Sequence, residues 1–188
     1  QPMCRERRAA PEYRQVIAKD RVLLRRLYDG LRAPGLSLTV ATRGRIVWSV
    51  SCGYADLATR RPVTAETRFR IGSVSKPLTA TALVDYAESG RVDLDTRADR
   101  YVDFPSHGGA ITLEELATHT SGLPRLSPGM MDAAGFDLSD PYANFGPDEA
   151  LTGLRSVDEE GIAANRGTFA YSNFGFTLLG LCLARATG

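Results

Sequence analysis

Two runs of β-branched and aromatic residues stand close together near the start of the chain. Residues 36–41 read LSLTVA and residues 45–55 read RIVWSVSCGYA, and only the three residues TRG separate them. Both runs alternate in part between apolar and polar residues, which is typical of strands. A short link that contains glycine favours an antiparallel hairpin. The chain must therefore bury at least one face of a small sheet under other elements.

Helical periodicity surrounds this hairpin. Before it, residues 11–31 carry apolar side chains at three- and four-residue spacings, which predicts an amphipathic helix with its apolar face formed by Val16, Leu23, Leu24, Leu27 and Leu31. After it, Thr112-Leu113-Glu114-Glu115 is a capping-box pattern that opens a short helix. Further helices are predicted over residues 74–89 and from Asn173 or Phe174 to the end, and residues 148–154 allow another short one. The rest of residues 125–166 reads as irregular.

Composition and charge exclude several classes of partner. The formal net charge is +1, from 23 basic and 22 acidic residues, so neither a nucleic acid nor an anionic membrane is expected as a partner. The longest apolar stretch, residues 174–184, is too short to span a bilayer, and no secretory signal is visible. A small arginine cluster, Arg5, Arg7 and Arg8, is expected to solvate an N-terminal tail over residues 1–10.

The three cysteines, Cys4, Cys52 and Cys182, are odd in number and far apart. No CxxC pair and no Cys/His cluster exists, which argues against a structural zinc site. We expect three free thiols, at least two of them buried, and no metal or cofactor.

Lysine is rare in this chain. Only Lys19 and Lys76 occur, against 21 arginines. Lys76 follows Ser73 by three residues in RIGSVSKPLTA, and residues i and i+3 of a helix share a face. A serine becomes a good nucleophile when a base takes its proton. Lysine can be that base where burial or a nearby cation lowers its pKa, whereas arginine stays protonated.

Pro77 refines the position of this pair. Because proline has no N–H to donate within a helix, Pro77 belongs to the first turn, and Ser73 lies at or just before the helix start. The positive end of a helix favours a developing oxyanion there. Serine at a helix start is nevertheless most often a cap, so this pattern alone does not establish catalysis.

A second group of polar residues lies near the end of the chain, in Phe169-Ala170-Tyr171-Ser172-Asn173. In extended backbone, Tyr171 and Asn173 point to the same side. A phenol beside a lysine ammonium has a lowered pKa and can exchange a proton with a serine. Asn173 offers both an amide donor and an acceptor. This pattern, too, is weak by itself.

Together these residues resemble the serine β-lactamase and penicillin-binding protein superfamily, whose motifs include Ser-x-x-Lys and then Tyr-x-Asn or Ser-x-Asn. The tyrosine form resembles the branch of class C β-lactamases, D-aminopeptidases and esterases. The similarity runs from about residue 30 to residue 188, through SGRVDLDTRADRYV, ITLEELATHTSGLPR and GTFAYSNFGFTLLG. GYAD and YSNFGFTLLG also resemble the mitochondrial β-lactamase-like serine proteins.

The resemblance implies an α+β fold of the three-layer α/β/α type, with an antiparallel sheet flanked by helices and a mostly helical subdomain. Residues 11–188 would be the N-terminal part of that domain. Residues 11–70 would supply a helix and the first two strands, and residues 71–188 the helical subdomain. Residues 125–166 would form a lid region over the site.

The resemblance also assigns roles. Ser73 would be the acylated nucleophile, and its backbone N–H one half of the oxyanion hole. Lys76 would be its proton acceptor or electrostatic partner, Tyr171 the base for acylation and deacylation, and Asn173 the group that orients the substrate amide. His119, in HTSGLP, would belong to a structural turn near the site rather than to the catalytic machinery, and His107 would be an exposed loop residue.

One family motif is missing. No Lys-Thr-Gly or His-x-Gly follows Asn173, although the strand that carries it supplies the second oxyanion N–H and a wall of the cleft. We therefore expect the N-terminal half of an enzyme, with most sheet strands absent, a long unpaired edge on the hairpin, and a need for the C-terminal half from the same or a second chain.

Two classes of function remain open. The first is a serine hydrolase that forms an acyl-enzyme with a small or peptide-like ester, amide or β-lactam and uses no cofactor. The second is a non-catalytic relative that binds such a ligand, covalently or not, or serves a structural role. A helical adaptor with an accidental Ser-x-x-Lys is a weaker alternative. A homo-oligomer is compatible with each, and the compartment would be periplasmic or extracellular in a bacterium and mitochondrial in the eukaryotic branch.

Overall fold

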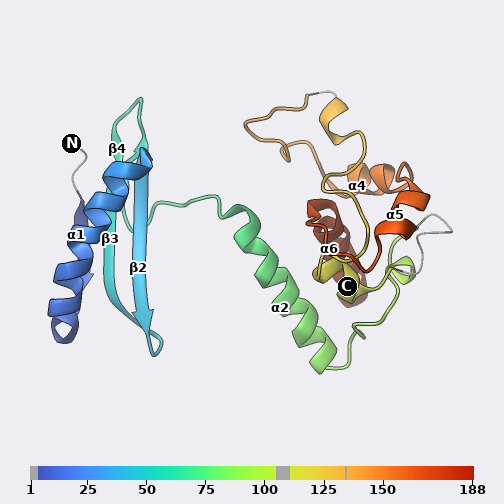
Figure 1. The fold of residues 1–188 in the computed structure, drawn as a ribbon, viewed down its shortest axis with the longest axis horizontal. Helices are drawn as coiled ribbons and strands as arrows, with labels where there is room; N and C mark the ends of the chain where they lie inside the picture. Colours follow the sequence, from blue (N-terminus) through green and yellow to red (C-terminus); the bar gives the residue numbers. More distant parts are fainter. Residues whose placement is uncertain (1–3, 105–110, 134) are drawn as a thin grey trace. The chain divides into compact units, whose positions relative to one another are not determined.

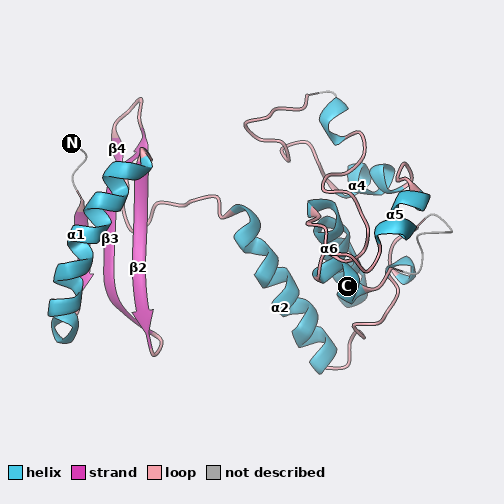
Figure 2. Cartoon of the chain, in the orientation of Figure 1, coloured by secondary structure: helices cyan, strands magenta, loops and turns pink. Residues whose placement is uncertain are grey.

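A computed structural model of the chain describes residues 4–104, 111–133 and 135–188. It divides into two compact units, residues 1–70 and residues 71–188 (Figure 1). Figure 2 shows strands with a helix in the first unit, and helices with long loops in the second. One antiparallel sheet together with helices confirms the α+β class that the sequence predicted.

The sheet of the first unit is antiparallel throughout and has the order β1-β3-β2, with a short strand β4 paired to the far end of β3. The predicted hairpin is confirmed as β2 and β3, joined by a tight turn in which Arg43 and Gly44 both have positive φ. The elements of this unit are β1 (Arg5–Ala9), a 3-10 turn η1 (Pro11–Tyr13), α1 (Arg14–Leu31), β2 (Gly35–Thr42), β3 (Arg45–Asp56) and β4 (Arg61–Pro62).

Helix α1 covers one face of this sheet (Figure 1). Ile17, Leu24 and Tyr28 project from α1 into one buried cluster with Trp48 and Val50 of β3. Burying such side chains contributes roughly 1.5–3 kcal/mol each, so this cluster stabilises the unit substantially.

The buried face of α1 differs from the predicted one. Of the expected apolar set, only Leu24 is buried, and Val16, Leu23, Leu27 and Leu31 are more than half exposed within the described structure. The helix has apolar residues on more than one side, so the three- and four-residue spacing fits two stripes. The stripe that contains Ile17 and Tyr28 is the buried one, because it packs against Trp48.

Strand β1 corrects the expectation of a solvated tail. Four of its five exposed residues pair with β3 on the side opposite β2, with a register shift at Arg7, so that edge of the hairpin is not unpaired. The Glu6 carboxylate holds β1 against its neighbours. It accepts hydrogen bonds from Arg21 Nη2 at 2.6 Å and from Trp48 Nε1 at 3.1 Å. These two contacts lower the pKa of Glu6, the Arg21 contact most strongly, against the opposing effect of burial.

A disulfide between Cys4 and Cys52 ties the start of β1 to β3 across 48 residues of sequence. The expectation of three free thiols was therefore wrong for these two cysteines and right for Cys182, which is free and buried. Burial raises the pKa of the Cys182 thiol to about 12, so this thiol is unreactive.

Removing the disulfide should destabilise the first unit. In the Cys4→Ser variant, we expect the free energy of unfolding of this unit to fall by about 2–4 kcal/mol, because the unfolded chain regains the freedom of a closed loop. Trp48 is the chain's one tryptophan and is buried beside Cys52, so its fluorescence in a urea titration reports this unit. The matched control is Cys182→Ala, which should leave the Trp48 transition in place. An unchanged urea midpoint for Cys4→Ser would show that the disulfide does not stabilise the fold.

The second unit is built around one helix. Helix α6 contacts α2, α3 and α4, and it buries Phe174, Leu178, Leu179 and Cys182 completely or almost so. The elements of the second unit are a 3-10 turn η2 (Gly72–Val74), α2 (Ser75–Glu88), η3 (Ala98–Arg100), α3 (Leu113–Ala117), η4 (Met130–Asp132), α4 (Pro147–Leu154), α5 (Glu159–Asn165) and α6 (Asn173–Thr187).

The helix signals of the second unit were largely correct. The capping box at Thr112 and Glu115 is present, with both of its hydrogen bonds, and Glu115 also forms an ion pair with Arg166 at 2.7 Å. Helix α5 was not predicted, because the segment before Ile162 reads Glu-Glu-Gly and carries no apolar periodicity. No helix among the described residues combines the length and apolar character needed to cross a bilayer.

Candidate active site

Ser73 lies in η2, immediately before the first turn of α2, as predicted. Gly72 has a φ of +52°, a backbone conformation that side chains disfavour, and it turns the chain into the helix. Pro77 is the third residue of α2, where no intrahelical N–H is required. The Ser73 side chain is exposed, so a reagent can reach its hydroxyl.

Lys76 lies one turn further along the same helix face. Its Nζ donates a hydrogen bond to Ser73 Oγ at 3.3 Å and another to Asn173 Oδ1 at 2.7 Å. The ammonium also lies 4.8 Å from the centroid of the Tyr171 ring and 5.5 Å from that of Phe176. Lys76 is therefore held against the serine by groups from the other end of the unit.

Tyr171 approaches Ser73 from the segment that leads into α6. Its hydroxyl donates to Ser73 Oγ at 2.6 Å, across 98 residues of sequence. The neighbouring Lys76 and then Ser73 lower the pKa of Tyr171, and Arg125, whose guanidinium lies 5.3 Å from the Tyr171 ring centroid, acts in the same direction. This environment favours a phenolate that can accept the serine proton.

Asn173 is the first residue of α6, and the N-cap Ser172 fixes its position. Ser172 Oγ accepts from Gly175 N at 2.8 Å and donates to Pro124 O at 2.7 Å. The Asn173 amide then faces outward with both ends engaged: Oδ1 accepts from Lys76, and Nδ2 donates to the hydroxyl of Tyr142 at 3.0 Å. The four residues singled out from the sequence, Ser73, Lys76, Tyr171 and Asn173, thus lie in one cluster.

Tyr142 was not identified from the sequence. It belongs to the loop before α4, in the region that read as irregular, and no motif marks it. The residue is 43% exposed, and its ring packs edge-on against Phe145, with 6.2 Å between the ring centroids. With Ser73, Lys76, Asn173 and Phe176 it lines a cleft of about 340 Å³. This volume is enough for a small molecule.

His119 packs against the residues that carry the cluster. Its Nδ1 accepts a hydrogen bond from the backbone N–H of Ser172 at 3.1 Å, and its ring packs at a tilt against Tyr171 and Phe176, at centroid distances of 4.4 and 4.9 Å. Burial, and then the charge of Lys76, lower the pKa of His119 and keep the imidazole neutral. Within the described part of the chain, His119 makes no hydrogen bond to Ser73, in keeping with a structural role. His107 lies outside the described residues.

His119 makes the stability of the second unit depend on pH. An unfolded imidazole takes up its proton near its ordinary pKa of about 6.5, whereas the folded one does so only at lower pH, so the unfolded state binds more protons as the pH falls. Stability should therefore decrease between about pH 7.5 and pH 5. The variant His119→Asn tolerates the positive φ of 61° and can still accept from Ser172, but does not titrate. We expect a smaller loss of unfolding free energy over this pH range in the variant, and an equal loss would contradict the assignment.

The chemistry available to this cluster is nucleophilic. The exposed Ser73 hydroxyl contacts the Tyr171 phenol and the Lys76 ammonium. Lys76 and Arg125 place positive charge beside the phenol, where a negative charge would develop. Among residues 4–104, 111–133 and 135–188, no group of three or more His, Cys, Asp or Glu side chains is placed to hold a metal ion.

Comparison with known proteins gives consistent matches. A family model described as Beta-lactamase matches residues 23–188. The chain is 40% identical over 121 residues to the mouse serine beta-lactamase-like protein LACTB, mitochondrial, covering 61% of the chain and 22% of that protein. It is 31% identical over 160 residues to penicillin-binding protein 4* of Bacillus subtilis, covering 81% of the chain and 32% of that protein.

Solved structures match in the same way. The octameric penicillin-binding protein homologue of Pyrococcus abyssi superposes with a TM-score of 0.74 at 28% identity, over 92% of this chain and 39% of that one. The class C beta lactamase of Rhodobacter sphaeroides superposes with a TM-score of 0.67 at 28% identity, over 89% of this chain and 44% of that one. The chain thus spans less than half the length of each of these four relatives.

Proposed function

Since this chain belongs to the Beta-lactamase family, we propose that it is a serine hydrolase that acts through an acyl-enzyme on an ester, an amide or a β-lactam. The observation that carries the proposal is the position of Ser73 Oγ, 2.6 Å from the Tyr171 hydroxyl and 3.3 Å from Lys76 Nζ. A serine used only as a helix cap would need neither neighbour.

In the acylation step, Tyr171 as phenolate takes the proton of Ser73, while Lys76 stabilises the phenolate. Ser73 Oγ bonds to the substrate carbonyl carbon, and the carbonyl electron pair moves to its oxygen. The tetrahedral intermediate then collapses, and the leaving group departs with the proton from Tyr171. Proton transfer by a positioned group of this kind contributes about 10²–10⁴-fold to a rate.

In the deacylation step, the same phenol oxygen accepts a proton from water. The hydroxide bonds to the acyl carbon, and Ser73 Oγ leaves with that proton. Asn173 would hold the substrate amide, because its side chain faces the cleft and is itself fixed by Lys76 and Tyr142. These roles follow the family motif at the matching positions.

The oxyanion hole would be shared between this chain and residues outside it. The backbone N–H of Ser73, at the positive end of α2, would be one donor. The second donor would come from a strand bearing the third family motif, which is not among these 188 residues. Losing one oxyanion donor costs on the order of 10²–10³-fold in rate, so the 188 residues alone should react slowly.

Substrate choice would depend on the lid region (residues 125–166), which contributes Tyr142 to the cleft. The substrate would be a small or peptide-like molecule. An octameric relative makes assembly of several copies a reasonable expectation for this chain as well. The second candidate function is covalent binding without turnover, which would need the exposed Ser73 hydroxyl but no activation of a deacylating water.

Hydrolysis assays separate these two functions. The protein would be incubated with a p-nitrophenyl ester, a chromogenic cephalosporin and a D-aminoacyl p-nitroanilide. A hydrolase gives a burst of one product per site followed by a steady rate, whereas a covalent binder gives the burst alone. In the control variant Tyr171→Phe, both phases should slow if Tyr171 serves both steps. Product release without any dependence on Ser73 or Tyr171 would reject the proposal.

A further inference from the structure

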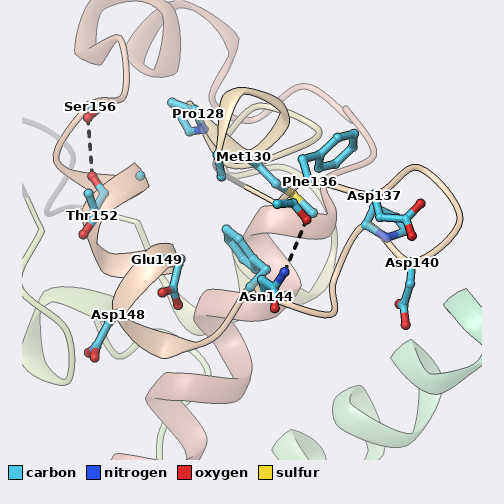
Figure 3. Close-up of a pocket in the computed structure, with 16 residues that line it drawn as sticks. Pro128, Met130, Phe136, Asp137, Asp140, Asn144, Asp148, Glu149, Thr152 and Ser156 are labelled. Carbon is cyan, nitrogen blue, oxygen red and sulfur yellow. Dashed lines mark hydrogen bonds between the residues drawn. The ribbon is translucent and has the colours of Figure 1, made fainter.

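A second pocket of about 400 Å³ lies in the lid region, outside the cleft that contains Ser73. Its apolar lining comes from Met130, which is buried, and from Phe136 and Phe145, which are partly buried. Figure 3 shows the side chains of Met130 and Phe136 at this pocket. This volume lies within the usual range for a small organic molecule.

Four carboxylates surround this apolar lining, and none of the described residues that line the pocket is a lysine or an arginine. Asp148 and Glu149 stand on one side of the apolar side chains, and Asp137 and Asp140 stand on the other (Figure 3). Two of the four are positioned by the backbone: Glu149 Oε2 accepts from Gly146 N at 2.9 Å, and Asp137 Oδ1 accepts from Ser139 N at 2.8 Å. The Ser139 hydrogen bonds lower the pKa of Asp137, which keeps this carboxylate ionised.

This combination selects a class of ligand. An anion would meet four like charges, and a neutral apolar molecule would gain nothing from them. A bare metal ion is disfavoured, because the described residues include no group of three or more side chains placed to bind one. A small cation with an apolar body can place its body on Met130, Phe136 and Phe145 and its charge near the carboxylates.

The pocket shares one wall with the active-site cleft. Asp140, Asn144 and Phe145 line the pocket, whereas Tyr142, in the same short segment, lines the cleft and accepts from Asn173 Nδ2. The segment is folded as consecutive turns, with Ala143 N bonded to Asp140 O at 3.1 Å and Phe145 N to Tyr142 O at 3.2 Å. A ligand that displaces the pocket side of these turns must also move Tyr142.

We propose that the lid pocket binds a small organic cation with an apolar body, such as an aromatic ammonium, and that its occupancy is transmitted to Asn173 through Tyr142. The site is separate from the acyl-enzyme chemistry, and binding needs no residue of the Ser73 cluster. The cation would act as a regulator of the cleft, since it changes the hydrogen bonding of Asn173 from outside.

Binding is tested by NMR titration of the ¹⁵N-labelled protein with 2-phenylethylammonium and with 2-phenylethanol, its neutral isostere. For so small a probe, we expect a dissociation constant on the order of 1 mM, with shifts at the amides of Phe136, Asn144 and Phe145. The alcohol should bind at least about fivefold more weakly, because it lacks the charge. Equal binding of both probes, or no shifts at these amides, would overturn the proposal.

Variants locate the charge effect. The double variant Asp137→Asn with Asp148→Asn should weaken the ammonium probe about 3- to 10-fold and leave the alcohol unchanged, because exposed ion pairs are individually weak. The matched control is Asp132→Asn, a nearby exposed carboxylate that does not line the pocket, and its affinity should equal that of the parent. If Asp132→Asn weakens binding as much as the double variant, the pocket is not the site.

The side-chain amide resonance of Asn173 tests the transmission. This resonance should shift on addition of the ammonium probe in the parent protein. The shift should be lost or strongly reduced in Tyr142→Phe, because phenylalanine has no hydroxyl to accept the hydrogen bond from Asn173. Shifts at the pocket amides with a stationary Asn173 side-chain resonance would show that the ligand binds but that the coupling is wrong.

Discussion

Replacing Ser73 with alanine is expected to abolish covalent labelling of the protein by penicillins and activated esters. Ser73 Oγ is the only atom of the cluster in hydrogen-bond contact with both Tyr171 and Lys76 among the described residues, so no second hydroxyl can replace it. Removing an activated nucleophile reduces rates by at least about 10³-fold and often far more. The measurement is the fraction of protein that carries an adduct after a fixed time.

The matched control for this variant is Ser75→Ala. Ser75 lies two residues further on, at the first position of α2, and its hydroxyl donates to the carbonyl of Gly72 at 2.7 Å rather than to a proton acceptor of the cluster. Ser75→Ala should label at close to the parent rate. Labelling that survives in Ser73→Ala, or disappears equally in Ser75→Ala, would contradict the assignment of the nucleophile.

Replacing Lys76 with arginine should reduce labelling about 10²- to 10⁴-fold, although the positive charge is kept. A guanidinium is planar and larger than an ammonium, so it cannot donate to Ser73 Oγ and Asn173 Oδ1 with the geometry of the lysine, and it stabilises the Tyr171 phenolate less well. The second-order rate constant for labelling by an activated ester measures the effect.

The chain provides its own control for this substitution. Lys19, the only other lysine, is exposed on α1, and Lys19→Arg should label like the parent protein. If Lys76→Arg also labels like the parent, then any positive charge beside Tyr171 is sufficient, and the hydrogen bonds of the lysine ammonium to Ser73 and Asn173 are not required. A circular-dichroism spectrum of each variant checks that the fold is retained.

Local signals in the sequence were sufficient for much of the fold. The hairpin, α2 and the capping box of α3 depend on short-range patterns, and each was found close to its observed position. Strand β1 could not be found in this way, because Arg-Glu-Arg-Arg has low strand propensity and becomes a strand only through pairing with β3. The Cys4–Cys52 disulfide follows from the same pairing, which sets Arg5 opposite Ser51.

The candidate site shows the same division. Ser73 and Lys76 could be linked from their spacing on one helix, whereas Tyr171 could be linked to them only through the family resemblance, since 98 residues separate it from Ser73. Tyr142 carries no sequence signal, and only the folded structure brings its hydroxyl to 3.0 Å from Asn173 Nδ2. Contacts between a loop and a distant helix depend on tertiary packing, which no local pattern encodes.

The most direct test of the central claim is intact-protein mass spectrometry, followed by peptide mapping, after incubation with a penicillin and with an activated ester. We predict a mass increase equal to one acyl group per chain, located on the peptide that contains Ser73 and slowed in Lys76→Arg. A folded protein that gains no adduct from either reagent, or that carries the adduct on another residue, would contradict the account of Ser73 as an acylated nucleophile.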